Sequence, residues 1–365
     1  MTLHASSAAL AVGTPAPGAP NTFTLARSAA IPSGGSSLSL DASAVPAKGS
    51  GLPAVRAPAT VTFSGSICGV VSEYPTLTAL SAPYGIAAGS DGAVWFTEED
   101  VGKIGRVTTA GTMTEYSSPG LTSPIGITLG PDGNDWFSDF GSDAIGRITS
   151  AGSITEYSIA TAAAGPTGIV TGSDGALWFT ESVADAIGRM TTGGSFTQYP
   201  VPTATSRPTF IAAGSDGALW FGEYAGEQVG RIPTGATPGS GAQITQYPAG
   251  AAVRGLAPGP DGALWFATAD AMNRIPTGAT PGSGAQITSY AIPGSPAATG
   301  VVRGPDGALW FSDFGNNAIG RITTAGAITE YTVPTANAGL QGIAVGPDDA
   351  IWFVECAANK IGRLQ

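Results

Sequence analysis

Residues 91–98 read DGAVWFTE, and this stretch decides the fold because close variants of it return six more times along the chain. In each variant an Asp-Gly pair or its equivalent precedes a Trp-Phe pair. All seven tryptophans of the protein occupy this one position: Trp95, Trp136, Trp178, Trp220, Trp265, Trp310 and Trp352. The tryptophans follow one another at intervals of 41 to 45 residues. A period of this length predicts a repeat architecture.

Each repeat holds four short apolar runs, bounded by Gly, Pro, Asp or Asn. β-Branched and aromatic residues fill these runs, which is the pattern of β-strands. The Asp-Gly pair predicts a tight hairpin between the first and second strands. Four strands in a period of this length are typical of a β-propeller blade. Neighbouring residues such as Trp95 and Phe96 point to opposite faces of a strand, so we interpret the tryptophans as packing between blades rather than as ligand contacts.

The two ends of the chain predict how the ring closes. An Arg position on the third strand and a Tyr position on the fourth each occur seven times, but the last repeat ends two residues after Arg363, before its fourth strand. Residues 72–74 read SEY, match that missing strand and precede the first repeat. We therefore predict an all-β, seven-bladed β-propeller closed by an N-terminal strand over residues 69–74.

Residues 1–60 differ in composition from the repeats. They are rich in Ala, Ser, Gly and Pro and carry little periodicity, so we predict a disordered N-terminal tail or linker, followed by the propeller over residues 61–365. No Lys or Arg precedes Arg27, so there is no clear signal peptide. The small-residue bias and the sparse lysines favour an extracytoplasmic or secreted protein.

Charge and hydropathy restrict the partners. The net charge is −11, which argues against nucleic-acid binding because that function needs a clustered basic face. No apolar run approaches the roughly 18 residues of a membrane span. We expect a monomer with a small-molecule or protein ligand at the central funnel. Cys68 and Cys356 are assigned to opposite ends of the closing blade, and we predict two free thiols.

Two features of the repeats vary. Residues 232–245 and 275–288 are the same fourteen-residue stretch, IPTGATPGSGAQIT, which we interpret as an internal copy that lengthens two turns. An acid follows the Trp-Phe pair in six repeats, and the fifth has Thr268 instead; the acids are Glu98, Asp139, Glu181, Glu223, Asp313 and Glu355. We interpret these acids as ion-pair partners of the repeat arginines, in preference to a ring that holds a hard cation.

The strand motifs P-x-G-I, G-P-D-G-x-L-W-F-T-E, N-x-I-G-R-I-T and G-x-I-T-E-Y, in this order, resemble the streptogramin lyase (virginiamycin B lyase) family over residues 70–365. The resemblance implies a seven-bladed propeller. It also implies a carbon–oxygen lyase that opens the lactone ring of a macrocyclic antibiotic by elimination, with a histidine base and a magnesium ion held by carboxylates.

The resemblance places the family's histidines on the inner strands of the last two blades. Thr299 and Gln341 stand at those positions here, Gly339 replaces a carboxylate, and Glu355 is the match for a metal-binding glutamate. The one histidine of the chain, His4, lies in the tail. Neutral Thr and Gln cannot act as a general base, and a carboxylate could do so only with a pKa raised by burial.

Three functions follow from these substitutions. The first is a lyase-like propeller without catalytic histidines that binds a ligand or partner. The alternative is a metal-dependent lyase acting on a streptogramin B antibiotic or a similar ester. The third is a purely structural surface propeller. Magnesium is the one cofactor that the resemblance implies.

One position on each inner strand is predicted to face the mouth of the channel. This set is rich in hydroxyl and amide groups and includes one cation: Tyr84, Ile125, Thr167, Thr209, Arg254, Thr299 and Gln341. All but Ile125 are candidate ligand-binding residues. Arg254 is suited to hold a carboxylate or phosphate through two parallel hydrogen bonds. The alternative is an Arg254 paired with a nearby acid or backbone carbonyl.

Overall fold

The computed structural model describes residues 2–3, 10–12, 25–27, 38–43, 56–61 and 69–365. The chain divides into two compact units, Met1–Ser66 and Ile67–Gln365. The described parts of the first unit are five strands, paired in the orders β1-β4-β5 and β2-β3: β1 (Thr2–Leu3), β2 (Leu10–Val12), β3 (Leu25–Arg27), β4 (Leu38–Ser43) and β5 (Arg56–Val61). The rest of the predicted disordered tail lies outside the described residues.

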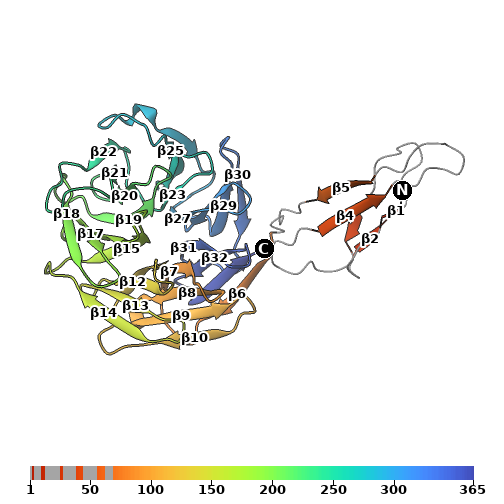
Figure 1. Cartoon of the computed structure of the whole chain (residues 1–365), viewed down its shortest axis with the longest axis horizontal. Helices are drawn as coiled ribbons and strands as arrows, with labels where there is room; N and C mark the ends of the chain where they lie inside the picture. Colours follow the sequence, from red (N-terminus) through yellow and green to blue (C-terminus); the bar gives the residue numbers. More distant parts are fainter. Residues whose placement is uncertain (1, 4–9, 13–24, 28–37, 44–55, 62–68) are drawn as a thin grey trace, which may run out of the picture. The chain divides into compact units, whose positions relative to one another are not determined.

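The second unit is a ring of seven four-stranded antiparallel sheets, so the predicted all-β propeller is confirmed (Figure 1). Blade one contains β7 (Pro83–Ala88), β8 (Ala93–Glu98), β9 (Lys103–Thr108) and β10 (Met113–Tyr116). Blade two contains β11 (Pro124–Leu129), β12 (Asp135–Asp139), β13 (Ala144–Ile148) and β14 (Ile154–Ser158). Blade three contains β15 (Pro166–Thr171), β16 (Leu177–Glu181), β17 (Ala186–Met190) and β18 (Phe196–Pro200).

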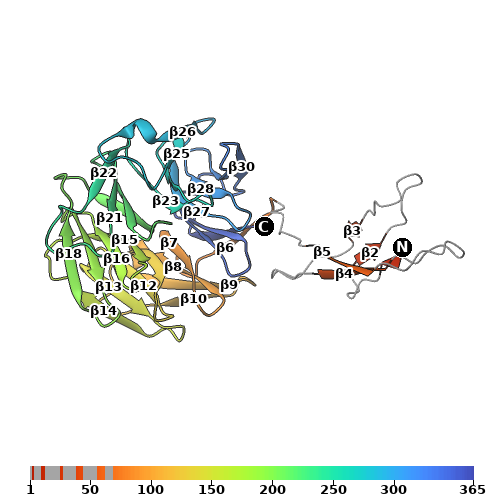
Figure 2. The same ribbon diagram turned by 45° about the horizontal axis from the view of Figure 1, so that its top comes forward.

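The later blades repeat this order, seen at a second angle in Figure 2. Blade four contains β19 (Pro208–Ala213), β20 (Leu219–Glu223), β21 (Gln228–Ile232) and β22 (Thr245–Pro248). Blade five contains β23 (Leu256–Pro258), β24 (Leu264–Ala267), β25 (Ala271–Ile275) and β26 (Thr288–Ala291). Blade six contains β27 (Ala298–Arg303), β28 (Leu309–Asp313), β29 (Ala318–Ile322) and β30 (Ile328–Thr332). Two short 3-10 turns, η1 (Glu99–Val101) and η2 (Gly284–Gln286), interrupt the strand pattern.

Blade seven joins the two ends of the propeller sequence. It contains β31 (Leu340–Val345), β32 (Ile351–Glu355) and β33 (Lys360–Leu364), and its outer strand is β6 (Val71–Pro75). Tyr74 pairs with Ile361 across β6 and β33. The predicted closure by an N-terminal strand is therefore confirmed.

Each tryptophan is fully buried, donates a hydrogen bond to the turn aspartate of its blade and stacks on a tyrosine of the same blade. In blade one, the Trp95 Nε1 donates a hydrogen bond to the Asp91 carboxylate at 3.2 Å, and the ring of Trp95 stacks on Tyr116 with centroids 5.6 Å apart. Arg106 donates to the second oxygen of Asp91 at 2.7 Å and lies 5.7 Å from the Trp95 ring centroid. One turn aspartate therefore holds both the tryptophan and the arginine.

The predicted pairing of the repeat arginines with the acids after the Trp-Phe pair is wrong. All seven arginines pair with the turn aspartates instead: Asp91, Asp132, Asp174, Asp216, Asp261, Asp306 and Asp348. The strand register explains this choice, because Trp95 lies opposite Arg106 whereas Glu98 lies opposite Lys103, at the other end of the strand.

Neighbouring blades are joined by tryptophan and phenylalanine. Trp95 of blade one lies in one buried cluster with Phe137 of blade two, and the pattern continues around the ring until Trp352 meets Phe96. In six of the seven blades the phenylalanine ring lies against a glycine on the next strand; in blade one, a Cβ at Gly105 would lie 2.0 Å from Phe96. The ring is therefore continuous in its packing as well as in its hydrogen bonding.

The two identical fourteen-residue stretches cover strand edges. Gly239 donates a backbone hydrogen bond to Gln198 on β18, the outer strand of the preceding blade, at 2.8 Å. Gly282 makes the same bond to Gln246 on β22. An outer strand has unpaired backbone groups that favour association with other chains, so both copies protect an edge.

Removing residues 1–75 is expected to open the ring, because it deletes β6 together with the Tyr74–Trp352 stacking contact. We expect the melting temperature to fall by about 10 °C or more and the exposed edge of β33 to cause aggregation, measured by differential scanning fluorimetry and light scattering. The matched control, removal of residues 1–55, should melt close to the full chain. Equal melting of both deletions would contradict the closure by β6.

Candidate functional site

The starts of the inner strands and the ends of the second strands lie at the same end of each blade, since Pro83 pairs with Glu98. We call the ring face at this end the upper face. The acids of the repeats are the last residues of the second strands and therefore lie near the same face as the predicted channel positions. The acids of the repeats and the predicted polar channel positions therefore share the upper face.

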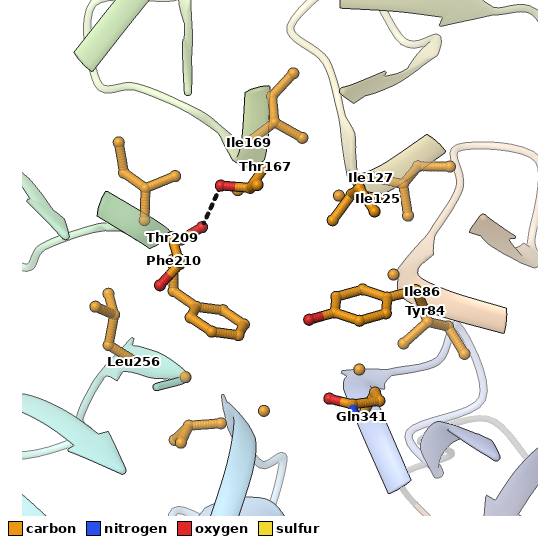
Figure 3. A pocket seen from close by; sticks show the side chains of 18 of the residues that line it. Tyr84, Ile86, Ile125, Ile127, Thr167, Ile169, Thr209, Phe210, Leu256 and Gln341 are labelled. Carbon is orange, nitrogen blue, oxygen red and sulfur yellow. Dashed lines mark hydrogen bonds between the residues drawn. The ribbon is translucent and has the colours of Figure 1, made fainter. Parts of the chain in front are cut away.

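The inner strands surround a central cavity of about 380 Å³ (Figure 3). A smaller cavity of about 150 Å³ shares Tyr84, Phe210, Tyr224 and Gln341 with it. Each of the seven predicted channel positions lines one or both cavities: Tyr84, Ile125, Thr167, Thr209, Arg254, Thr299 and Gln341. The structure brings them together, and ligand binding by them stays a prediction.

Two of the three threonines of this set, Thr167 and Thr299, are bound to the scaffold, whereas the buried Thr209 hydroxyl has no hydrogen-bond partner among the described residues. The Thr167 hydroxyl donates to the backbone carbonyl of Thr209 on the next inner strand at 3.0 Å. Thr299 is 7% exposed, and its hydroxyl donates to the carbonyl of Leu340 at 3.2 Å. A hydroxyl has a single donor, so these two side chains link neighbouring blades and have no further proton to offer a ligand.

Arg254 differs from the repeat arginines because its guanidinium has no partner. No hydrogen bond or ion pair joins it to another residue of the described chain, and its buried Nε lacks an acceptor. The alternative of a structural pair with an acid or carbonyl is therefore wrong for the described residues. The Arg254 backbone N–H donates to the Ala267 carbonyl at 2.9 Å, which fixes the residue beside the end of β24.

Three charged or aromatic cavity residues were missed by the sequence analysis: Arg207, Phe210 and Tyr224. The guanidinium of Arg207 lies 5.6 Å from the ring centroid of Tyr224. Figure 3 shows the side chains of Phe210 and Tyr84 pointing toward each other across the channel. A signal for Phe210 was present in the sequence. Blade four reads P-T-F-I, whereas the inner segments of the other blades carry a glycine at the position of Phe210, as in P-T-G-I of blade three.

The acids after the Trp-Phe pair are buried and divide by their partners. The Asp139 carboxylate accepts backbone N–H bonds from Thr122 and Ser123 at 2.9 and 2.8 Å, and that of Asp313 accepts one from Ala297 at 2.9 Å. Both side-chain oxygens of Glu98 and Glu355 have no hydrogen-bond partner among the described residues. Glu355 therefore has no hydrogen-bond donor that stabilises its charge, and Ser81 is the one hydroxyl that favours the charged form of Glu98.

Burial, together with the nearby Glu115 carboxylate, raises the pKa of Glu98 to about 7. Burial likewise raises the pKa of Glu355 to about 7, with Glu73 as the neighbouring acid. Lysines are close, but Lys103 binds Glu115 and Lys360 binds Glu73, each at 2.8 Å. Desolvation is thus the dominant cause of both shifts.

The described residues around Glu355 do not fit a magnesium ion held by several carboxylates. Among all described residues, no group of three or more His, Cys, Asp or Glu is placed to hold a metal ion. Glu73, the neighbouring acid, is occupied by Lys360 and by the hydroxyl of Thr335 at 2.7 Å. Cys356 is a free cysteine, and Cys68 lies outside the described residues.

The buried glutamates predict a stability that depends on pH. An unfolded glutamate titrates near its ordinary value of 4.5, whereas Glu98 and Glu355 titrate near 7 when folded. The folded state then binds more protons between these values, so the free energy of unfolding falls as pH rises from about 4.5 to about 7. Glu98→Gln and Glu355→Gln should each stabilise the protein at pH 8 by about 1–3 kcal/mol and change little at pH 5.

Urea unfolding at pH 5 and pH 8 measures this effect. Asp139→Asn serves as the control, because the new amide replaces an acceptor of backbone N–H bonds with a donor, and it should destabilise at both pH values. Glutamine variants that lower stability equally at pH 5 and pH 8 would contradict the raised pKa values.

Comparisons with known proteins agree with the propeller fold. The model of the virginiamycin B lyase family matches residues 64–247 and 211–365. A solved streptogramin B lyase is 34% identical, with a TM-score of 0.73, over 81% of this chain and 97% of that one. A catalytically inactive virginiamycin B lyase from Staphylococcus aureus, solved with quinupristin, is also 34% identical, with a TM-score of 0.73, over 81% and 99% of the two chains.

More distant structures share the fold alone. The extracellular domain of a hybrid two-component system from B. thetaiotaomicron is 15% identical, with a TM-score of 0.60, over 80% of this chain and 42% of that chain. No helix among the described residues has the length and hydropathy needed to span a membrane. The family model covers the whole propeller, and the chain belongs to the virginiamycin B lyase family.

Proposed function

We propose that this protein binds a ligand in its central channel and does not carry out the elimination of its family through a histidine base. One observation carries the proposal. The described residues that line the two cavities include no histidine, aspartate or glutamate. Burial raises the pKa of Tyr84, one of the two tyrosines that line the cavities, so its hydroxyl stays protonated near neutral pH and does not act as a base.

The substitutions at the family's histidine positions support the same conclusion. Thr299 and Gln341 are neutral at every pH of interest, and the Thr299 hydroxyl is bonded to the backbone of neighbouring strands. The neighbour solved with quinupristin carries a histidine-to-alanine change and is catalytically inactive. By analogy, a chain whose propeller contains no histidine retains a binding site and loses the proton-transfer step.

A second candidate is a metal-dependent lyase that opens the lactone of a streptogramin B antibiotic or a similar ester, with Glu355 as a metal ligand. The buried carboxylate of Glu355, which has no hydrogen-bond partner, favours this candidate. A protein ligand on the upper face, a monomeric state and a location outside the cytoplasm remain predictions from the sequence.

An assay of ring opening separates the two candidates. The full-length protein is incubated with quinupristin and magnesium, and the mass and fragmentation of the product are followed by mass spectrometry. We expect no opening above a control without protein, whereas virginiamycin B lyase from Staphylococcus aureus serves as the positive control. Turnover that disappears in the Glu355→Gln variant would overturn the proposal in favour of the metal-dependent lyase.

A further inference from the structure

We propose that the smaller cavity binds an aromatic carboxylate, with its ring among Tyr84, Phe210 and Tyr224 and its carboxylate on Arg254. The inference rests on the proposed function, because it names the ligand class of the same channel. Three observations support it: the volume of the cavity, the unpaired guanidinium of Arg254, and several residues in blades four and five that differ from the repeat pattern.

The size and walls of the cavity fit one aromatic ring. Its volume of about 150 Å³ matches that of an engineered apolar cavity that accepts one benzene molecule. Three of its six lining residues are aromatic: Tyr84, Phe210 and Tyr224. Aromatic walls favour a planar ring through offset-stacked or edge-to-face contacts. The adjoining cavity of about 380 Å³ leaves room for substituents on that ring.

The charge of the cavity selects an anion. Arg254 is half-buried, and its buried Nε has no acceptor among the described residues, so its guanidinium favours an anionic ligand over a neutral one. Arg207 adds a second positive charge at the larger cavity. No acidic side chain is among the described residues lining either cavity. A carboxylate fits the guanidinium because its two oxygens match the two parallel N–H donors.

The position of Phe210 depends on blade five. The inner glycines of other blades lie against the next inner strand, since a Cβ at Gly168 would lie 2.6 Å from the carbonyl oxygen of Thr209. Phe210 replaces this glycine in blade four. Its neighbour β23 has three residues, whereas β19 and the other inner strands have six. Residues 252–255, which precede β23, are assigned to no strand, and Figure 3 shows the Phe210 ring pointing into the channel.

Two more departures lie beside Arg254. Thr268 replaces the buried acid of the other blades, so the cation has no repeat carboxylate next to β24. Arg274 lies 13 positions after Asp261, whereas Arg231 lies 15 after Asp216, so the loop after β24 is two residues shorter. Together with Phe210 and the short β23, these changes remove an acid and shorten the rim at the place where Arg254 is exposed to the cavity.

Isothermal titration calorimetry of the full-length protein tests the inference with four probes. Benzoate has the ring and the charge, cyclohexanecarboxylate keeps the charge without an aromatic ring, benzyl alcohol keeps the ring without the charge, and inorganic phosphate is an anion without a ring. We expect saturable binding of benzoate in the millimolar range appropriate for a fragment of this size, at least tenfold weaker binding of cyclohexanecarboxylate, and no saturable binding of benzyl alcohol or phosphate.

Variants assign the contacts. Arg254→Ala should weaken benzoate binding at least tenfold, and Arg254→Lys should weaken it less, because lysine keeps the charge without the planar fork. Phe210→Gly, which restores the residue of the other blades, should also weaken it. Arg303→Ala is the matched control, since Arg303 is an exposed arginine on β27 outside the cavity lining, and it should bind as the unchanged protein does. Melting temperatures confirm that each variant is folded.

The outcomes are distinguishable from those of the proposed function. Absence of benzoate binding, equal binding of benzoate and cyclohexanecarboxylate, or unchanged binding by folded Arg254→Ala would each overturn the aromatic-carboxylate inference. None of these results bears on ring opening of quinupristin, which tests the proposed function by a separate readout. Phosphate binding that depends on Arg254, without benzoate binding, would show an anion site of a different class.

Discussion

The contact between the tryptophan of one blade and the phenylalanine of the next holds the propeller together. A four-stranded sheet with apolar residues on both faces cannot bury them alone, so each blade depends on two neighbours. The Trp352–Phe96 contact closes this series. Truncating a buried tryptophan typically costs 3–5 kcal/mol, and the turn aspartate and third-strand arginine keep each tryptophan in one orientation. Stability therefore resides between the blades, and the channel lining is left free to vary.

The closing blade adds electrostatic contacts to this packing. Glu73 on β6 receives hydrogen bonds from Lys360 of β33 and from the backbone of Thr335, at 2.8 and 2.9 Å. Blade one repeats the arrangement with Lys103, Glu115 and Thr78. The buried glutamates Glu98 and Glu355 lie in these same two blades and oppose stability when charged. Lys103 and Lys360 therefore offset part of the unfavourable charge of the two buried glutamates at the place where the chain closes its ring.

Periodicity explains what the sequence could predict. Several properties follow from the period, so a correct assignment of one blade assigns them in the others. They are the number of blades, the burial of the tryptophans, closure by the strand around Tyr74 and the channel position of residues such as Gln341. The partner of Arg106 could not be chosen in the same way, because the turn aspartate recurs in seven repeats and the acid after the Trp-Phe pair in six, so both follow the period. Only the register across β8 and β9 places Arg106 beside Asp91. Tyr224 was missed because it lies in a loop, whose conformation the strand pattern does not specify.

The candidate site is formed by residues that differ from the repeat pattern, and not by residues that all blades share. The family resemblance places catalytic histidines in blades six and seven, where this chain has Thr299 and Gln341. Its unusual groups, Phe210 and Arg254, lie in blades four and five, with a short inner strand and a missing acid beside them. Repeat contacts keep the scaffold unchanged around these substitutions, since each blade touches only its neighbours. A channel can therefore lose the groups for proton transfer on one side and gain an aromatic and cationic surface on another without a change of fold.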